Sequence, residues 1–118
     1  MAGLKTQLSD FVRVEGIKSA VIVGRDGFVI EGVTNDGNLD IEAIGAILST
    51  GLGTSEVMGK ELNVGKLTQS MVEYESGVLV MGTLGIDALL CVVCDQGSNL
   101  GNVRLQVKKR SPNLLAEL

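Results

Sequence analysis

The residues with the clearest chemical potential are two cysteines, Cys91 and Cys94, which are separated by two valines. In a cytosolic protein a C-x-x-C pair can carry redox chemistry or supply half of a zinc site. This pair lies in an apolar, β-branched segment, and residues three apart on a strand point to opposite faces of the sheet. The sequence has no histidine and no other cysteine to complete a metal shell. The pattern therefore predicts two buried, inert thiols and no metal site.

Two acidic residues, Glu73 and Glu75, have the spacing of a carboxylate pair on one side of a strand. Paired carboxylates can act as general acid and base, but on a polar edge strand such charges are usually solvated and deter aggregation. The lack of histidine also removes the commonest general base and the Ser/His and Cys/His nucleophile pairs. We therefore expect no catalytic residue in this chain.

Two glycine-containing segments resemble parts of nucleotide-binding motifs. Residues 51–56, GLGTSE, begin like a dinucleotide-binding fingerprint, but Glu56 stands where the third glycine is required. Residues 65–68, GKLT, resemble the end of a phosphate-binding loop, but Leu67 stands where Ser or Thr is required and the earlier glycine is missing. The sequence therefore predicts no bound nucleotide and no cofactor.

Composition narrows the function classes further. The chain has 118 residues, which suits one domain over residues 1–118, and its core must be aliphatic because only 3% of residues are aromatic. A net charge of −4 argues against nucleic acid as a partner. No apolar run approaches ~20 residues and no signal-peptide core is present, so we expect a cytoplasmic protein without membrane insertion. The basic run KKR at 108–110 favours solubility, with contact to an acidic partner as the alternative.

Hydrophobic periodicity divides the chain into helices and strands that must position these residues. The sequence predicts helices over residues 4–14, 40–62 and 99–110, and strands over residues 19–24, 28–33, 66–75, 78–84 and 88–95. Asp40 and Ser98 are the expected N-caps of the second and third helices. Pro112 is expected to end the last helix, which leaves a short C-terminal tail over residues 111–118.

The resulting order is α-β-β-α-β-β-β-α, and short turns after the first, third and fourth strands predict antiparallel pairs. The strands over residues 19–24 and 88–95 are apolar on both faces, so they belong in the middle of the sheet. We therefore expect an α+β sandwich with a five-stranded antiparallel sheet in the order 2-1-5-4-3. The long helix should cover one face, and the two terminal helices the other.

The long helix is apolar or small around most of its circumference. One arc, suited to docking on the sheet, contains Ile41, Ile44, Leu48, Leu52, Ser55 and Leu62. The outer arc, roughly opposed to it, contains Ala43, Ala46, Ile47, Thr50, Thr54, Val57 and Met58. A chain this short has little left to cover the outer arc, so we expect another protein chain to do so. The glycines at 45, 51, 53 and 59 indicate either a loosened helix or close approach of a neighbouring backbone.

The segment from Gly16 to Ile30, with its strand-turn sequence VGRDG, carries a family resemblance. Together with the order of elements, which matches from Leu4 to about Arg110, it resembles the Roadblock / dynein light chain domain family and its MglB-like small-GTPase partner proteins. The resemblance implies a helix-covered five-stranded sheet, obligate dimerisation and no catalytic centre. Members of the family act as scaffolds, as regulators of small Ras-like GTPases or as dynein subunits.

The resulting hypothesis is a cytoplasmic, non-catalytic homodimer, or a higher oligomer, that binds and modulates a small Ras-like GTPase. Its expected dimer interface comprises Ala43, Ala46, Ile47, Thr50, Thr54, Met58, Thr68, Ser70 and Val72. Its expected partner-binding surface is the polar seam of the long helix, formed by Glu42, Ser49, Gly53, Glu56 and Lys60. The alternatives are a structural adaptor of a motor or membrane-associated complex, and a small-ligand sensor domain.

Overall fold

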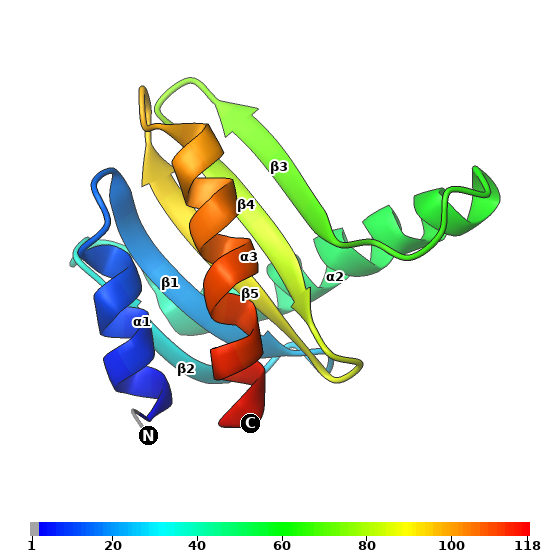
Figure 1. Cartoon of the computed structure of the whole chain (residues 1–118), viewed down its shortest axis with the longest axis horizontal. Coiled ribbons are helices and arrows are strands. Elements are labelled where there is room, and N and C mark those ends of the chain that lie inside the picture. The colour runs from blue at the N-terminus through cyan, green and yellow to red at the C-terminus, as the bar shows by residue number, and fades with distance from the viewer. Residues whose placement is uncertain (1–2) are drawn as a thin grey trace.

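A computed structural model describes residues 3–118 and contains the three helices and five strands that the sequence predicts (Figure 1). The elements are α1 (Leu4–Val12), β1 (Ile17–Gly24), β2 (Val29–Thr34), α2 (Ile41–Glu61), β3 (Gln69–Tyr74), β4 (Gly77–Leu84), β5 (Ala88–Asp95) and α3 (Leu100–Ala116). Most ends lie within one or two residues of their predicted places. The largest difference among the strands is β3, which begins three residues later than expected.

The strands form one antiparallel sheet in the order β2-β1-β5-β4-β3, which confirms the predicted topology. The central strands β1 and β5 are buried over nearly their whole length, as expected for strands covered on both faces. β3 lies at one end of the sheet and pairs only with β4 within the described residues. Its other edge therefore has free backbone donors and acceptors.

Two hydrophobic clusters lie on opposite faces of the sheet. On one face Leu8 and Phe11 of α1 pack with Val103 and Val107 of α3, and on the other Leu48 and Leu52 of α2 pack against the strands. Alternate residues of β1 belong to the two clusters, because successive side chains of a strand point to opposite faces of the sheet. Figure 1 shows the same layers, with α1 and α3 in front of the sheet and α2 behind it.

At one point the β1–β2 turn packs against α2 backbone to backbone. Gly27 has a φ of +89°, a conformation that suits glycine, and its carbonyl oxygen lies where a Cβ at Gly45 would have to stand. A Cβ at Gly59 would likewise lie 3.0 Å from the carbonyl oxygen of Gly65, whereas Gly51 and Gly53 face open space. Close approach therefore explains two of the four helix glycines, and the contact lies within the chain.

Two predictions about α3 are wrong. The N-cap is Asn99, whose Oδ1 accepts a hydrogen bond of 3.0 Å from the backbone N–H of Asn102, while the Ser98 hydroxyl donates to the Asp95 carbonyl at 2.5 Å, with the Gly16 carbonyl 3.3 Å away. The helix also continues through Pro112 to Ala116, so the expected tail is largely helical. Pro112 has no backbone N–H to donate to the carbonyl of Lys108, but Lys108 is exposed, so water can hydrogen-bond to that carbonyl. Burial of the Leu114 side chain in the core offsets the free energy lost with this helical hydrogen bond.

Within residues 3–118, no helix is both long and apolar enough to cross a lipid bilayer.

Candidate functional site

The candidate site is the side of α2 that faces away from the sheet. The helix begins at an Asp40 cap, as predicted, with the backbone N–H of Ala43 donating to Asp40 Oδ1 at 3.2 Å. Leu48 and Leu52 are buried against the sheet, and Ile41 and Ile44 pack beside them. These contacts fix the rotation of α2, so the opposite side of the helix must face outward.

The outer arc is exposed along its whole length in the single chain. All seven members predicted from the helical pattern are exposed, and the Ile47 side chain is 69% exposed. The hydroxyls of Thr50 and Thr54 donate to the carbonyls of Ala46 and Thr50, at 2.9 and 3.0 Å. Their polar atoms are thereby occupied within the helix, so the outer arc presents mainly methyl and methylene groups.

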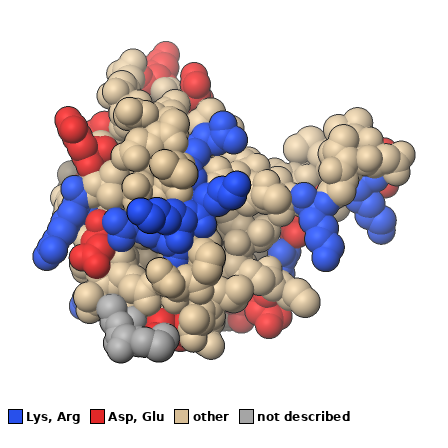
Figure 2. Space-filling model, viewed as in Figure 1, with Lys and Arg blue, Asp and Glu red and all other residues tan. Residues whose placement is uncertain are grey.

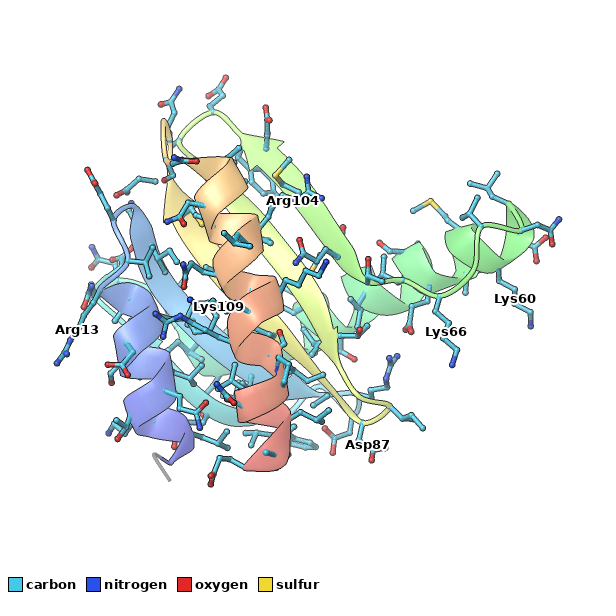
Figure 3. The ribbon with its side chains drawn as sticks, viewed as in Figure 1. Arg13, Lys60, Lys66, Asp87, Arg104 and Lys109 are labelled. Carbon is cyan, nitrogen blue, oxygen red and sulfur yellow. The ribbon has the colours of Figure 1, made fainter. Side chains whose placement is uncertain are left out.

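The C-terminal end of α2 projects beyond the sheet. Figure 1 shows this end, and the loop that follows it, standing clear of the strands. Leu62 was expected on the arc that docks on the sheet, and this placement is wrong, since the side chain is 71% exposed beyond the sheet edge. Val57, Met58 and Val64 are exposed with it, so the projecting end is apolar. Lys60 and Lys66 add two cations there (Figure 3).

The edge strand β3 also has side chains on the α2 face of the sheet. Ser70 and Val72 are half-buried, and they pair across the strands with Met81 and Leu79. Paired residues of antiparallel strands share a face, and Met81 belongs to the cluster under α2. Ser70 and Val72 therefore lie on the α2 side of the sheet. Thr68 is exposed just before β3, and its carbonyl accepts from the N–H of Thr83 at 3.4 Å.

The polar seam of α2 is partly occupied by contacts within the chain. The Ser49 hydroxyl donates to the carbonyl of Arg25 at 2.7 Å. Glu56 binds the Arg25 guanidinium through both carboxylate oxygens, with Oε2 2.9 Å from Nη2 of Arg25. This hydrogen-bonded cation lowers the pKa of the Glu56 carboxyl from its ordinary value of 4.5. Glu42 and Lys60 are exposed, and Gly53 is half-buried with open space above it.

Arg25, which the sequence shows only as part of the turn VGRDG, joins three parts of the fold. Its guanidinium binds Glu56 of α2 and donates to the carbonyl of Ile86 in the β4–β5 turn, and its backbone N–H donates to the carbonyl of Asp87 at 3.0 Å. The pairing with Glu56 raises the pKa of Arg25 above its ordinary value. The two partners are 31 residues apart, and no local pattern in the sequence connects them.

The two cysteines lie on opposite faces of β5, as the strand geometry predicted. Cys91 belongs to the cluster under α2, and Cys94 to the cluster under α1 and α3. Burial, chiefly by removing water from the thiolate, raises the pKa of Cys91 to about 12 and that of Cys94 to about 11. With pKa values this high both thiols are protonated at neutral pH, so we expect neither to act as a nucleophile or a metal ligand.

The remaining motif-like segments occupy positions unsuited to the chemistry they suggest. Residues 51–56 lie within α2 and do not join a strand to a helix, and residues 65–68 lead from α2 into β3, the reverse of the order in a phosphate-binding loop. Glu73 and Glu75 are exposed at the end of the sheet. In the described part of the chain no group of three or more Cys, Asp or Glu residues could hold a metal ion.

Comparison with known proteins places the chain in a family. The model of the Roadblock/LC7 domain matches residues 4–94. The Methanocaldococcus jannaschii protein MJ0310 is 35% identical over 109 residues, which cover 92% of this chain and 94% of the relative. MglB from Myxococcus xanthus has a TM-score of 0.89 at 20% identity, covering 96% of this chain and 92% of MglB. An MglB with a tetrameric arrangement has a TM-score of 0.87 at 21% identity, covering 95% and 85%. The chain belongs to the Roadblock/LC7 domain family.

Proposed function

We propose that this protein is a non-catalytic, cytoplasmic homodimer that binds and modulates a small Ras-like GTPase. Two kinds of support are available. The exposed apolar surface of α2 and β3 supports the dimer, and membership of the Roadblock/LC7 family, whose members include regulators of such GTPases, supports the partner. The partner surface depends on how the two α2 helices of the dimer are arranged.

The dimer forms through the outer arc of α2 and the free edge of β3. A twofold axis beside β3 pairs this strand with its copy, so the two sheets become one and the free backbone groups are satisfied. The same axis brings the two α2 helices together on one face of the joined sheet. Small side chains at Ala43, Ala46 and Thr50 permit the close approach that this requires.

One observation carries the dimer: the outer arc of α2 is apolar and exposed, and the edge strand β3, unpaired on its outer side in the described residues, has side chains on the same face of the sheet. An exposed apolar surface rimmed by polar residues is typical of a protein interface. The MglB structure with a tetrameric arrangement shows that a protein of this fold self-associates, and association of this chain is our inference from its own surface.

The GTPase docks on the polar seam, and both copies of the seam lie on the helical face of the dimer. The charged side chains of Glu42 and Lys60 are exposed and available to a partner, whereas Ser49 and Glu56 are already bound to Arg25. The arginine beside the seam, Arg25, is already paired with Glu56, so it is not placed to serve as an arginine finger. Modulation therefore works by favouring one conformation of the switch loops of the GTPase.

The experiment mixes purified protein with small GTPases of the same cell, each loaded separately with GDP and with a GTP analogue. Complex formation is measured by analytical ultracentrifugation, and GTP turnover and nucleotide release are measured with and without the protein. We expect a complex with at least one GTPase and a changed rate of turnover or release. Failure to bind any of them would contradict the regulatory proposal, and binding without a change in either rate would favour the adaptor alternative.

A matched pair of variants separates seam binding from non-specific charge effects. Glu42→Lys with Lys60→Glu leaves the net charge unchanged but reverses the two free charges of the seam. We expect this double variant to remain a dimer and to lose most of its affinity for the GTPase. Glu117→Lys with Lys5→Glu makes the same exchange far from α2 and should bind as the wild type does.

A further inference from the structure

A second surface lies on the opposite face of the sheet, in a groove between α3 and the strands β3 and β4. The groove has a volume of about 730 Å³, and α3 forms one wall while β4 forms the floor. Figure 1 shows that α3 crosses the sheet and leaves β3 uncovered on this side. This groove is separate from the outer arc of α2, which lies behind the sheet.

The wall that α3 provides is apolar at both ends. Leu105 is 57% exposed and Leu115 is 46% exposed, and both line the groove together with Pro112. Residues 105, 108, 112 and 115 recur at helical spacing, so these side chains form one continuous stripe along α3. Glycine at position 82 of the floor lets α3 pack closely on β4, because a Cβ there would lie 3.3 Å from Val107.

The charges of the groove are all positive. Arg104 and Lys108 line it, and no Asp or Glu is among its lining residues. Within residues 3–118 neither cation has a carboxylate partner, and the Arg104 guanidinium makes a long hydrogen bond of 3.5 Å to the side-chain oxygen of Gln69. The chain as a whole has a net charge of −4, so the local charge of the groove is opposite in sign to the net charge of the protein. Figure 2 shows Lys and Arg side chains gathered over α3 on this face.

We propose that this groove binds an acidic amphipathic segment of a partner protein. Carboxylates of the segment pair with Arg104 and Lys108, and two or three of its large apolar side chains pack on Leu105 and Leu115. The complementary charge selects the partner and speeds its approach, and the apolar stripe supplies the buried area. An amphipathic helix lying in a hydrophobic groove is a recurring mode of peptide recognition that fits this combination.

The test uses a phage-displayed library of random 16-residue peptides, selected on the purified 118-residue protein. Selected sequences are synthesised, and their affinities are measured by fluorescence anisotropy against the wild type and a groove variant, Arg104→Glu with Lys108→Glu. We expect selected peptides to carry net negative charge and at least two large apolar residues. We expect the groove variant to bind them about tenfold or more weakly, since it replaces two attractions with two repulsions.

The control variant is Lys109→Glu with Arg13→Glu, which changes the net charge by the same amount outside the groove. Figure 3 shows Lys109 on the α1 side of α3, away from Arg104, and neither control residue lines the groove. This variant should bind the peptides as the wild type does, apart from a small general effect of charge. A Leu105→Ser variant should also weaken binding, which a purely electrostatic contact would not require.

Three outcomes would overturn the proposal. The first is selection of neutral or basic peptides, and the second is equal loss of binding in the groove and control variants. The third is binding of phosphatidylserine vesicles that depends on Arg104 and Lys108 when no acidic peptide is selected, which would identify a membrane surface instead. None of these measurements uses a GTPase or the outer arc of α2, so the groove proposal can fail while the proposed function stands, and the reverse.

Discussion

The carboxylate of Glu56 and the guanidinium of Arg25 form a two-point ion pair that ties the middle of α2 to the β1–β2 turn. About two helical turns before Glu56, the hydroxyl of Ser49 donates a hydrogen bond to the carbonyl of Arg25 in the same turn. The carbonyl of Gly27, also in this turn, lies against Gly45 of α2. α2 is therefore held by three polar or backbone contacts along one flank, in addition to its buried leucines. These contacts fix the direction in which the outer arc points.

Replacing Glu56 by Gln should lower the free energy of unfolding by about 1 kcal/mol or less, because the pair is partly exposed to water. The effect depends on pH in a defined direction. The folded protein lowers the pKa of Glu56 below its ordinary 4.5, so the pair stabilises the protein above that pH and ceases to do so as the pH falls through the lowered value. Denaturant unfolding between pH 7 and pH 3 should show the difference between wild type and E56Q shrinking in acid. A difference that grew in acid would contradict this assignment.

The cysteines should be unreactive in the folded protein. A thiol whose pKa is about 12, as for Cys91, or about 11, as for Cys94, is thiolate only to roughly one part in ten thousand or one in a thousand at pH 8. Iodoacetamide at pH 8 should therefore modify neither thiol over a time in which both react fully in denaturant. Cys91→Ser should cost about 1–3 kcal/mol of stability if the new hydroxyl finds no partner. Rapid modification of native protein would show that the strand is not packed as described.

The sequence predicts the sheet well because its signals are local and repeated. The two strands that are apolar on both faces identified the centre, and short turns fixed the antiparallel pairs, so the order 2-1-5-4-3 followed. The end of α3 was wrong because a proline signal is local, whereas the burial of Leu114 is a property of the folded core. The Arg25–Glu56 pair was missed for the same reason, since only the fold brings these two residues together.

The candidate site could be predicted only in outline. The helical pattern identifies the side of α2 that is exposed in the single chain, whereas the assignment of that side to a dimer interface stays a prediction. The helical pattern does not show that α2 extends beyond the edge of the sheet, so it wrongly predicts Leu62 on the buried side. Likewise it could not tell which seam residues are free, since Ser49 and Glu56 have the same polar character as Glu42 and Lys60.

Pro112 should weaken α3, and its removal should stabilise the protein. Pro112→Ala restores the N–H that the Lys108 carbonyl lacks and replaces the poorest helix former by the best, so we expect a gain of about 1–3 kcal/mol. Leu114→Ala should do the opposite, because it empties a fully buried site, at a cost of about 2–5 kcal/mol. Urea unfolding of both variants measures the two effects. A destabilising Pro112→Ala would show that the proline ring makes a contact worth more than the lost hydrogen bond.

Two helix glycines should respond oppositely to alanine. Gly45→Ala places a Cβ against the carbonyl oxygen of Gly27 and should destabilise the protein, since backbone on both sides leaves no room to adjust. Gly53→Ala meets open space and should stabilise α2 by up to about 1 kcal/mol, because alanine is the better helix former. Thermal unfolding of the two variants provides a direct comparison. Equal effects at both positions would contradict the close contact between the turn and the helix.

Substitutions on the outer arc of α2 should change the oligomeric state of the protein more than substitutions on its other surfaces. Ala46→Arg or Thr50→Arg adds bulk and charge where two helices of a dimer would approach, and a twofold axis makes each substitution count twice. We expect either variant to sediment as a monomer or to aggregate, while Lys108→Ala on α3 remains a dimer. Circular dichroism verifies that the variants keep their fold, since both positions are exposed in the single chain. A wild-type protein that sediments as a monomer at micromolar concentration, or arginine variants that remain dimeric, would show that the interface lies on another face.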